Sequence, residues 1–406
     1  MKYIILQGDG MADYPLDVLG NKTPLEAART PNMDWLASRG VFGIAHVIPK
    51  GFPPGSDVGN MSIMGYNPAV YHTGRSPLEA ASMGVALGPG DIAFRCNLVT
   101  LGGQGDQTYM EDFTSGHIST DEAREIIRDI GVKLGGDGIE FFPGVSYRHL
   151  MVWRDGKEKM NTTPPHDITD QKIATYLPKG DGAEKLLNLM ERSCSVLANH
   201  PVNQKRQSEG LRQATSIWLW GQGRAPALPP LTKRFGIKGG VISAVDIIHG
   251  LGVYAGLERI DVPGITGFLD TNYKGKGQYG VRSLDRNDLV FIHVEATDEA
   301  GHMGDVEKKI QAIEDFDEKV VGTVLKGMAH RKDWRVLLMP DHPTAITLKT
   351  HVSDPVPFVL YSAEDPRHNG KVGYNEKDAR RTGIVAKQAF RLMEALIEGR
   401  QTWTET

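Results

Sequence analysis

The stretch DLVFIHVEATDEAGH, residues 288–302, decides the fold that the sequence predicts. Its first half is an almost unbroken apolar run, which is typical of a strand buried on both faces, as in parallel sheets. Asp298 follows this run, and His302 comes four residues later. If the segment TDEAGH turns helically, both side chains lie on one side of that turn. The stretch therefore predicts a buried strand that leads into two potential metal ligands.

Three further apolar runs end abruptly at a Gly, Asp or Pro residue or just before an acidic one. KYIILQ ends at Gly8-Asp9, WRVLLMP ends at Asp341-His342, and VPFVLYS ends at Ala363-Glu364. Apolar residues recur at three- and four-residue steps in residues 306–327 and again in residues 375–397, which predicts two helices. Strands and helices in alternation indicate an α/β fold with right-handed crossovers.

The middle of the chain has a different pattern. From about residue 91 to residue 230, two strand-like pieces (AFRCNLVTL and RHLMVW) occur with two helical ones (DEAREIIRDI and AEKLLNLMERSCSVLA). Proline-rich stretches separate these pieces, and RAPALPPLTKRFG has the composition of a hinge. We expect a smaller domain of sheet and helices, residues 91–230, inserted into a first domain formed by residues 1–90 and 231–406.

Composition excludes several classes of protein. The 406 residues carry a formal net charge of -4, from 46 basic and 50 acidic side chains, so no nucleic-acid or membrane partner is indicated. Cys96 and Cys194 fit no metal or redox spacing, which favours a reducing compartment, the cytoplasm. The apolar part of MKYIILQGDG is too short for a signal peptide or a membrane span.

Potential metal ligands follow the predicted strands directly. In an open parallel sheet, ligands bind at the carboxyl ends of the strands. Each such residue alone is more commonly a turn or cap residue, but several at successive strand ends predict a metal site. Carboxylate and imidazole without thiolate suit Mn²⁺, Zn²⁺ or Mg²⁺. The six candidates exceed the need of one catalytic ion, so we expect two ions that clamp a phosphoryl group. These candidates are Asp9, Asp298, His302, Asp341, His342 and His351.

The segment PPGSDVGNMS, residues 53–62, places Ser56 in a stiff setting before an apolar run. One interpretation is a helix N-cap, in which the hydroxyl accepts a backbone hydrogen bond worth ~1 kcal/mol. The other is a nucleophile, because a helix N-terminus favours a bound phosphate and a divalent ion lowers the pKa of a serine hydroxyl. The second interpretation predicts a phosphoserine intermediate, provided that the predicted ligands reach Ser56.

With these residues identified, the chain resembles the cofactor-independent phosphoglycerate mutases of the archaeal type, within the alkaline phosphatase superfamily. The resemblance runs essentially end to end. It is carried by DGMADYP, KTPLEAARTPNMDWLA, PPGSDVGNMSIMGYNP, TGRSPLEAASMGV, AFRCNLVTL, VEATDEAGH and MPDH with THVSDPVPF. It implies a mostly parallel sheet with helices on both faces, which holds two divalent ions, and an inserted α+β domain that grips the substrate and closes to exclude water.

The resemblance also implies roles for individual residues. One ion would be bound by Asp9, Ser56, Asp341 and His342, and the other by Asp298, His302 and His351. Ser56 would accept the phosphoryl group of a small phosphorylated substrate and return it to a neighbouring hydroxyl, so that 3-phosphoglycerate and 2-phosphoglycerate interconvert without 2,3-bisphosphoglycerate, as in glycolysis and gluconeogenesis. The candidates for binding the substrate's carboxylate and phosphate are Arg95, Arg148, His149, His166 and Lys238.

Two stretches depart from the family pattern. EDFTSGHIST has no arginine where the archaeal mutases tend to carry an arginine-rich stretch, and WLWGQGRAP has tryptophan in place of an arginine. Lost guanidinium groups remove bidentate partners for a carboxylate or phosphate. The alternative is therefore a sister group proposed to act as homoserine kinase in threonine biosynthesis, with the same metal and serine chemistry. Weaker alternatives are phosphomonoesterase or sulfatase activity and a non-catalytic binding protein that kept the fold.

Overall fold

The structure is a computed structural model, and it describes residues 1–400 of the chain. These residues form two compact units. The first unit consists of Met1–His72 and the segment from Ala227 onward, and the second unit is Thr73–Pro226. The first division lies earlier than the expected boundary after residue 90, because the helix α5 (Ser76–Ser82) contacts strands of the second unit. The second division, after residue 226, falls within the proline-rich stretch RAPALPPLTKRFG.

The first unit is built on one sheet of eight strands. Their order is β11-β10-β12-β1-β13-β16-β2-β17. All neighbouring pairs are parallel except those of β16 with β13 and with β2. The expected mostly parallel α/β fold is confirmed. The bounds are β1 Lys2–Gly8, β2 Val41–Ala45, β10 Gly239–Ile242, β11 Glu258–Arg259, β12 Leu289–Val294, β13 Trp334–Leu338, β16 Val356–Ser362 and β17 Val385–Ala386.

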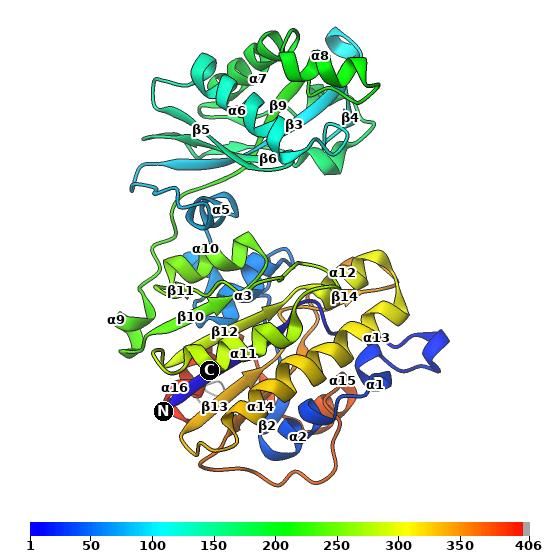
Figure 1. The fold of residues 1–406 in the computed structure, drawn as a ribbon, viewed down its shortest axis with the longest axis vertical. Coiled ribbons are helices and arrows are strands. Elements are labelled where there is room, and N and C mark those ends of the chain that lie inside the picture. The colour runs from blue at the N-terminus through cyan, green and yellow to red at the C-terminus, as the bar shows by residue number, and fades with distance from the viewer. Residues whose placement is uncertain (401–406) are drawn as a thin grey trace. The chain divides into compact units, whose positions relative to one another are not determined.

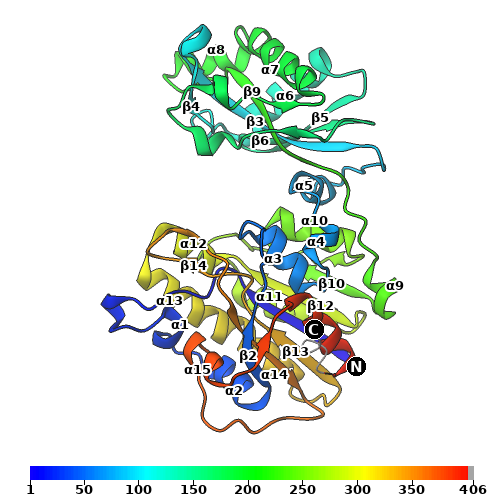
Figure 2. The same cartoon turned by 180° about the vertical axis from the view of Figure 1, so that it is seen from behind.

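Helices cover both faces of this sheet. On one face, α2, α11, α13 and α14 bury apolar side chains against the even-numbered residues of β1, including Ile4 and Leu6 (Figure 1). On the other face, α10 contacts β10, α16 contacts β13, and α3 lies against α10 (Figure 2). The principal helices are α2 Pro31–Arg39, α3 Ser56–Ile63, α10 Asp246–Tyr254, α11 Tyr273–Ser283, α12 Ala296–Met303, α13 Val306–Asp315, α14 Gly322–Met328, α15 Glu376–Arg381 and α16 Leu392–Glu398.

Short elements complete the first unit. The hairpin pair β14 (Thr344–Ala345) and β15 (Thr350–His351) is antiparallel and follows β13 in the chain. The remaining short helices are η1 Asp17–Leu19, α1 Pro24–Ala27, α4 Pro68–Tyr71, α9 Leu231–Phe235 and η6 Ala389–Arg391. No helix within residues 1–400 is both long and apolar enough to cross a membrane.

Two helical predictions need correction. Residues 306–327 form one continuous helical segment, but a π-helical turn, Phe316–Val321, separates α13 from α14. Residues 375–397 do not form one helix. Gly383 has a φ of 70°, and β17 then pairs with β2 before α16 begins. A short helix, a strand and a second helix each bury apolar side chains in this segment. Their combined spacing resembles that of a single helix.

The alignment of three parallel strands positions the candidate ligands. In register, Gly8 of β1 is opposite Val294 of β12, and Leu6 of β1 is opposite Leu338 of β13. All three strands consist almost entirely of buried residues, as the apolar runs predicted. Their carboxyl ends therefore meet at one edge of the sheet, and the chain leaves each strand there.

A buried ion pair supports the loop that follows β1. Lys309 Nζ of α13 lies 2.7 Å from Asp13 Oδ2 and also donates to Ala12 O and Thr344 O. The amide of Asp13 donates to Glu376 Oε1, which belongs to α15. Lys309 and Asp13 are fully buried, so each charge depends on its partners in the folded state. The pair joins α13, the β1 loop and β14 beneath the candidate ligands.

The second unit is an antiparallel sheet with helices, as expected for an α+β domain. Its strand order is β4-β3-β6-β5, and β9 also pairs with β3. The strands are β3 Ile92–Gly102, β4 Tyr109–Asp112, β5 Ile139–Val145, β6 Arg148–Trp153 and β9 Ser216–Gly223, with a separate pair β7 Met160–Asn161 and β8 Lys179–Gly180.

The helices of the second unit form where the sequence predicted them. The helix α6 (Thr120–Leu134) begins with a capping box between Ser119 and Glu122 and buries apolar residues at three- and four-residue steps. With α7 (Ala183–Leu197) it covers a core that includes Phe94, Met151 and Trp218. The remaining helices are α8 Pro201–Ser208 and the short η2 Gly105–Gln107, η3 Pro165–Ile168 and η4 Ile173–Thr175.

His149 of β6 is an ionisable residue inside this core. It is 3% exposed, its Nδ1 accepts a hydrogen bond from the Gly144 amide, and its Nε2 is buried without a hydrogen-bond partner within residues 1–400. Burial lowers the pKa of His149 from 6.5 to about 3. The folded second unit therefore holds this imidazole neutral, whereas the unfolded chain protonates it near its ordinary pKa.

We expect this histidine to make the protein acid-sensitive. Because the folded pKa is depressed, the unfolded state binds more protons below pH 6.5, and stability is lost as pH falls. The contribution is about 2 kcal/mol in the free energy of unfolding between pH 6.5 and about pH 5. Urea unfolding of wild type and His149→Gln at several pH values measures it. The variant should show the shallower loss, and the exposed His330→Gln should match wild type; equal slopes in all three proteins would contradict the prediction.

Candidate metal centre

The predicted ligands come together at the carboxyl edge of the first unit's sheet. Asp9 follows β1 directly, Asp341 and His342 follow β13, and Asp298 lies in the first turn of α12, just after β12. All four side chains are buried. His351 of β15 and His302 in the last turn of α12 are partly exposed. The topology therefore brings together all six side chains that the sequence singled out.

One group surrounds His342. Its Nε2 lies 3.6 Å from Asp9 Oδ1 and 3.3 Å from Asp341 Oδ2. The same nitrogen is 3.4 Å from Ser56 Oγ. Ligand atoms of Asp9, Asp341 and His342 lie within 4.8 Å of one another, which is the spacing that a single ion requires. With Ser56 these are the four residues expected to share one ion.

A second group surrounds Asp298. Its Oδ2 lies 3.2 Å from His302 Nε2, and its Oδ1 lies 3.3 Å from His351 Nε2. Asp298 and His302 are on one face of α12, as the TDEAGH spacing predicted. The rings of His342 and His351 stack with centroids 4.0 Å apart, so the second group adjoins the first. Asp298, His342 and His351 also meet the spacing for one ion.

The hydrogen bonds of the three histidines leave one nitrogen of each free to bind a cation. His302 Nδ1 lies 3.0 Å from Lys349 O, and His351 Nδ1 lies 3.1 Å from Pro54 O. Carbonyl oxygens only accept, so both Nδ1 atoms carry hydrogen, and in the neutral imidazoles both Nε2 atoms carry a lone pair. These Nε2 atoms are 2.8 Å apart. Two lone pairs at that distance repel, so the pair needs either a proton on one of the two nitrogens or a metal ion bound by both.

Thr344 likewise determines which nitrogen of the His342 ring carries hydrogen. Its hydroxyl donates to Asp298 Oδ1 and lies 3.3 Å from His342 Nδ1. A hydroxyl has one hydrogen, so His342 Nδ1 must be the donor to Thr344, and His342 Nε2 is left with its lone pair. Thr344 thus connects the two groups. A Cβ atom at Gly10, which has a φ of 57°, would collide with the Thr344 hydroxyl and Asp298, so this close approach requires glycine.

Electrostatics at the site also demand positive charge. The pKa of Asp9 is raised well above its usual range by burial and by the charges of Asp341, Glu295 and Asp298. Without a bound ion, the hydrogen bond to Asp298 is the main cause that raises the pKa of His302 to about 9, so a proton would then occupy the nitrogen that a metal ion would bind. Burial would raise the pKa of Asp298, but the hydrogen bonds from His302 and His351 outweigh it and hold that pKa well below its usual range. Divalent cations would supply the charge that these buried carboxylates lack.

Ser56 is the first residue of α3, and its hydroxyl does not cap the helix. The N-cap residue is Gly55, and no side chain caps this end. The alternative interpretation of Ser56 as an N-cap is therefore wrong. Asn60, one turn later, donates to Ser56 O at 2.9 Å and to Asp341 Oδ2 at 3.1 Å. Pro54 binds His351 through its carbonyl oxygen, so the stiff PPGS segment holds both the serine and a candidate ligand.

Several residues of the site were not predicted from the sequence. His293 and Glu295 form a third group with Asp9 that meets the spacing for an ion. His293 lies in β12, where an imidazole in a strand buried on both faces was a usable signal. Glu295 belongs to the motif VEATDEAGH. Asn60 and Thr344 carried no signal, because amide and hydroxyl side chains are common at helices and turns.

The second unit brings three of the predicted substrate-binding residues together. Arg95 lies 2.9 Å from Glu79 and 4.4 Å above the ring of Trp220. Its pKa is lowered mainly by burial; the charge of Glu79 opposes this, and those of Arg75 and Arg148 add to it. His166 stacks edge-on against Trp220, and its pKa is lowered mainly by burial, with Arg95 and Arg75 contributing. We call Arg75, Arg95, Arg148 and His166 the basic cluster; Arg75 was not predicted.

Two members of the basic cluster have uncompensated charge. Arg75 and Arg148 are exposed, and neither guanidinium has a carboxylate partner among the residues that the structure describes. The stretch EDFTSGHIST has no arginine or lysine, and its Asp112 accepts hydrogen bonds from Thr114, Gly116 and Arg212. An exposed anion is the natural partner of such a cluster.

Two other candidates are placed elsewhere, which corrects the prediction for them. His149 is buried in the core of the second unit. Lys238 comes directly before β10, and its amide donates to Asp288 Oδ2 at 3.1 Å. It therefore lies at the amino end of a strand parallel to β12, at the opposite edge of the sheet from Asp298. The sequence alone does not show at which edge of the sheet a residue lies when it comes immediately before an apolar strand.

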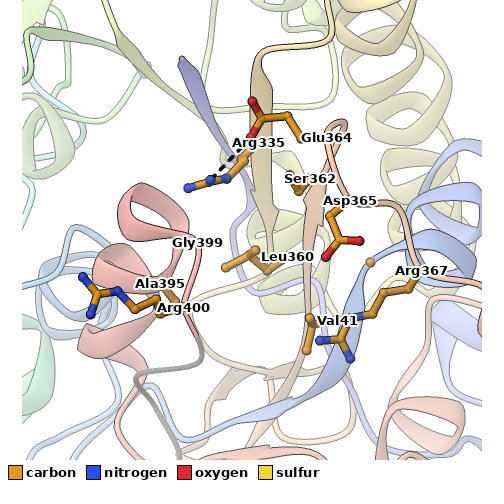
Figure 3. A pocket seen from close by; sticks show the side chains of 11 residues that line it. Val41, Arg335, Leu360, Ser362, Glu364, Asp365, Arg367, Ala395, Gly399 and Arg400 are labelled. Carbon is orange, nitrogen blue, oxygen red and sulfur yellow. Dashed lines mark ion pairs between the residues drawn. The ribbon is translucent and has the colours of Figure 1, made fainter.

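A cavity of about 130 Å³ also lies at that opposite edge (Figure 3). It is lined by Arg335 near the start of β13 and by Leu360 and Ser362 near the end of the antiparallel β16. Arg335 donates to Leu396 O and Ile397 O of α16 and pairs with Glu364 at 3.7 Å. Its charge is thus used to hold the last turn of a helix, and the cavity has none of the candidate ligands.

Comparisons with known proteins point to one family. The family model described as 2,3-bisphosphoglycerate-independent phosphoglycerate mutase matches residues 37–203. A probable enzyme of that name from Geobacter sulfurreducens is 54% identical over 98% of this chain and 100% of its own length. One from Methanosarcina mazei is 50% identical over 98% of this chain and 100% of its own.

Solved structures agree as well. A cofactor-independent phosphoglycerate mutase from Thermoplasma acidophilum has a TM-score of 0.68 and 28% identity, over 98% of this chain and 99% of its own. A protein from Pyrococcus horikoshii has a TM-score of 0.82 and 26% identity, over 98% and 96% of the two chains. Relatives at half identity over nearly the whole length decide the assignment: the chain belongs to the 2,3-bisphosphoglycerate-independent phosphoglycerate mutase family.

Proposed function

We propose that this chain interconverts 3-phosphoglycerate and 2-phosphoglycerate through a phosphoserine on Ser56, with two divalent ions and without 2,3-bisphosphoglycerate. The names of the relatives support the reaction. The observation that carries the mechanism is the position of the Ser56 hydroxyl, 3.4 Å from His342 Nε2 and beside two adjoining groups of metal-type ligands. The reaction is a step of glycolysis and gluconeogenesis. The two free cysteines suit a cytoplasmic enzyme.

The candidate ligands would divide between the ions as the resemblance to the family implies. Asp9, Ser56, Asp341 and His342 would hold one ion, and Asp298, His302 and His351 would hold the other. Divalent ions bound there would polarise the phosphoryl oxygens and lower the pKa of the Ser56 hydroxyl. Thr344 and the Lys349 and Pro54 carbonyl groups hold hydrogen on the Nδ1 atoms of His342, His302 and His351, so an ion would bind the Nε2 atoms and would displace any proton there. The metal identity is left open among Mn²⁺, Zn²⁺ and Mg²⁺.

Ser56 then transfers the phosphoryl group in two steps. Its Oγ forms a bond to phosphorus while the bond to the 3-oxygen of the glycerate breaks, and the proton that Ser56 loses is balanced by the proton that the released oxygen gains. The 2-hydroxyl attacks the phosphoserine in the reverse sense and regenerates the serine. Ser56 is only 8% exposed, which limits hydrolysis of the phosphoserine by water.

The basic cluster of the second unit would bind the negatively charged groups of the glycerate. Arg75 and Arg148 have exposed, unpaired guanidinium groups, and Arg95 is pre-oriented by Glu79 and Trp220. Three members of the cluster are arginines, and arginine is the side chain best suited to bind carboxylate and phosphate groups. None of the comparisons favours the homoserine kinase alternative.

Metal removal tests the centre. Exhaustive dialysis against a chelator should abolish interconversion of the two phosphoglycerates, because the buried carboxylates and Ser56 then lack the charge that activates them. Adding Mn²⁺, Zn²⁺ or Mg²⁺ singly should restore activity and identify the preferred ion. Full activity in protein shown by elemental analysis to be metal-free would contradict the proposal.

Substitution of the serine tests the covalent step. Ser56→Ala should lower kcat by about 10³-fold or more, because the phosphoryl group has no acceptor. Ser62→Ala is the matched control: Ser62 lies on the same helix, is equally buried and donates to Val47 O, so its loss affects stability but not the reaction. Mass spectrometry of wild type quenched during turnover should find phosphate on the peptide that contains Ser56, and Ser56→Ala turning over near the wild-type rate would exclude the intermediate.

Substitution of the exposed arginines tests the basic cluster. Arg75→Ala and Arg148→Ala should each raise KM for 3-phosphoglycerate by about 10–100-fold, the range for loss of a charge-assisted hydrogen bond. Arg124→Ala is the control, because Arg124 lies on α6 in the same unit and pairs only with the exposed Asp121. Unchanged KM in Arg75→Ala and Arg148→Ala, with the overall fold intact by circular dichroism, would remove the cluster from substrate binding.

A further inference from the structure

We propose that His293, held by Ser243, is a positioning residue for Asp9: its imidazole donates to one Asp9 oxygen and thereby directs the other toward His342 and Asp341. The inference rests on the proposed metal centre. His293 Nε2 lies 2.8 Å from Asp9 Oδ2 and 3.3 Å from Glu295 Oε2. On the far side of the ring, His293 Nδ1 lies 3.0 Å from Ser243 Oγ. The side chains of Ser243, His293 and Asp9 are fully buried.

Ser243 decides which nitrogen of His293 carries the proton. Its Oγ accepts a hydrogen bond from the Val245 amide at 2.9 Å. The one acceptor found for its own hydrogen within residues 1–400 is His293 Nδ1. A buried hydroxyl that left its hydrogen unpaired would cost roughly 1–3 kcal/mol, so the hydroxyl donates to Nδ1. The ring proton is therefore on Nε2, where it faces Asp9.

This hydrogen bond leaves one defined oxygen of Asp9 available. Oδ2 accepts from His293, whereas Oδ1 is buried without a hydrogen-bond partner within the described chain and lies 3.6 Å from His342 Nε2. The backbone of Asp9 is fixed as well, because its amide donates to Val294 O and its carbonyl accepts from Thr297 Oγ1. With the backbone fixed, the carboxylate cannot turn without breaking the hydrogen bond from His293. Groups that hold a ligand in this way commonly account for 10–100-fold in metal affinity.

The same proton excludes a third ion. Asp9, His293 and Glu295 meet the spacing for a metal ion, but a ring nitrogen that carries hydrogen has no lone pair to bind one. Lys276 adds positive charge to this side, because its buried Nζ donates to His293 O at 2.8 Å. We therefore infer that this group is a hydrogen-bonded support for Asp9, and that the chain binds two divalent ions rather than three.

Calorimetric titration of the chelator-stripped full chain with Mn²⁺ tests the inference. Wild type should bind two ions. His293→Leu should weaken one of the two sites by about 10–100-fold and leave the other unchanged. His293→Gln, whose amide can still donate to Asp9, should restore most of the loss. His249→Leu is the matched control, because His249 is also buried and its Nε2 has no hydrogen-bond partner within residues 1–400.

Each result of these titrations either supports or overturns the inference. Wild-type affinity in folded His293→Leu, an equal loss in His249→Leu, or a third Mn²⁺ in wild type would each overturn the inference. If His293→Leu does not fold, Ser243→Ala decides: it removes the donor that fixes the tautomer, together with the acceptor of the Val245 amide, and leaves the His293 ring in place. It should weaken the same site, and unchanged affinity would overturn the inference. A wild-type chain that binds no Mn²⁺ would instead refute the proposed metal centre, so the two failures are distinguishable.

Discussion

The parallel alignment of β12, β1 and β13 is the constraint on which the site depends. Adjacent parallel strands share a direction, so whatever follows them meets at one edge. Here the register sets Gly8 beside Val294 and Leu6 beside Leu338, and the next residues of each chain segment carry carboxylate or imidazole groups. The strands themselves are apolar and buried on both faces, which secures the alignment. A hydrophobic interior thus determines where the charges are.

Charge concentrated in this way creates its own requirement. Asp9, Glu295, Asp298 and Asp341 lie close enough that their charges raise the pKa values of Asp9 and Glu295, after burial itself. The backbone carbonyl groups of Pro54 and Lys349 and the hydroxyl of Thr344 orient three histidines so that their Nε2 atoms face these carboxylates. Such an arrangement is unfavourable without cations and favourable with them, which is the thermodynamic basis for a tightly bound metal pair.

The residues that support the candidate ligands are held by hydrogen bonds as closely as the candidate ligands themselves. Lys309 and Asp13 hold the β1 loop against β14, Thr344 joins the two ligand groups, and Ser243 and His293 hold Asp9. These residues come from segments that are distant in the sequence. Buried polar groups of this kind need nearly complete sets of partners, so each fixes the position of the next. The second unit has its own core and presents the basic cluster.

The sequence alone determined the fold class and predicted six candidate ligand side chains at the carboxyl edge of the sheet, because the residues that follow parallel strands meet at that edge. It failed where one pattern serves several structures. Residues 375–397 have the apolar spacing of one helix, although Gly383 and β17 interrupt them. Nothing in the sequence around Lys238 and His149 showed at which edge of the sheet Lys238 lies or that His149 is buried. Only the tertiary structure decided the tautomers of the histidines, the bridging role of Thr344, and the pairing of Asp9 with His293. Those depend on hydrogen bonds between residues up to 297 positions apart, and such contacts leave no local periodicity or composition in the chain.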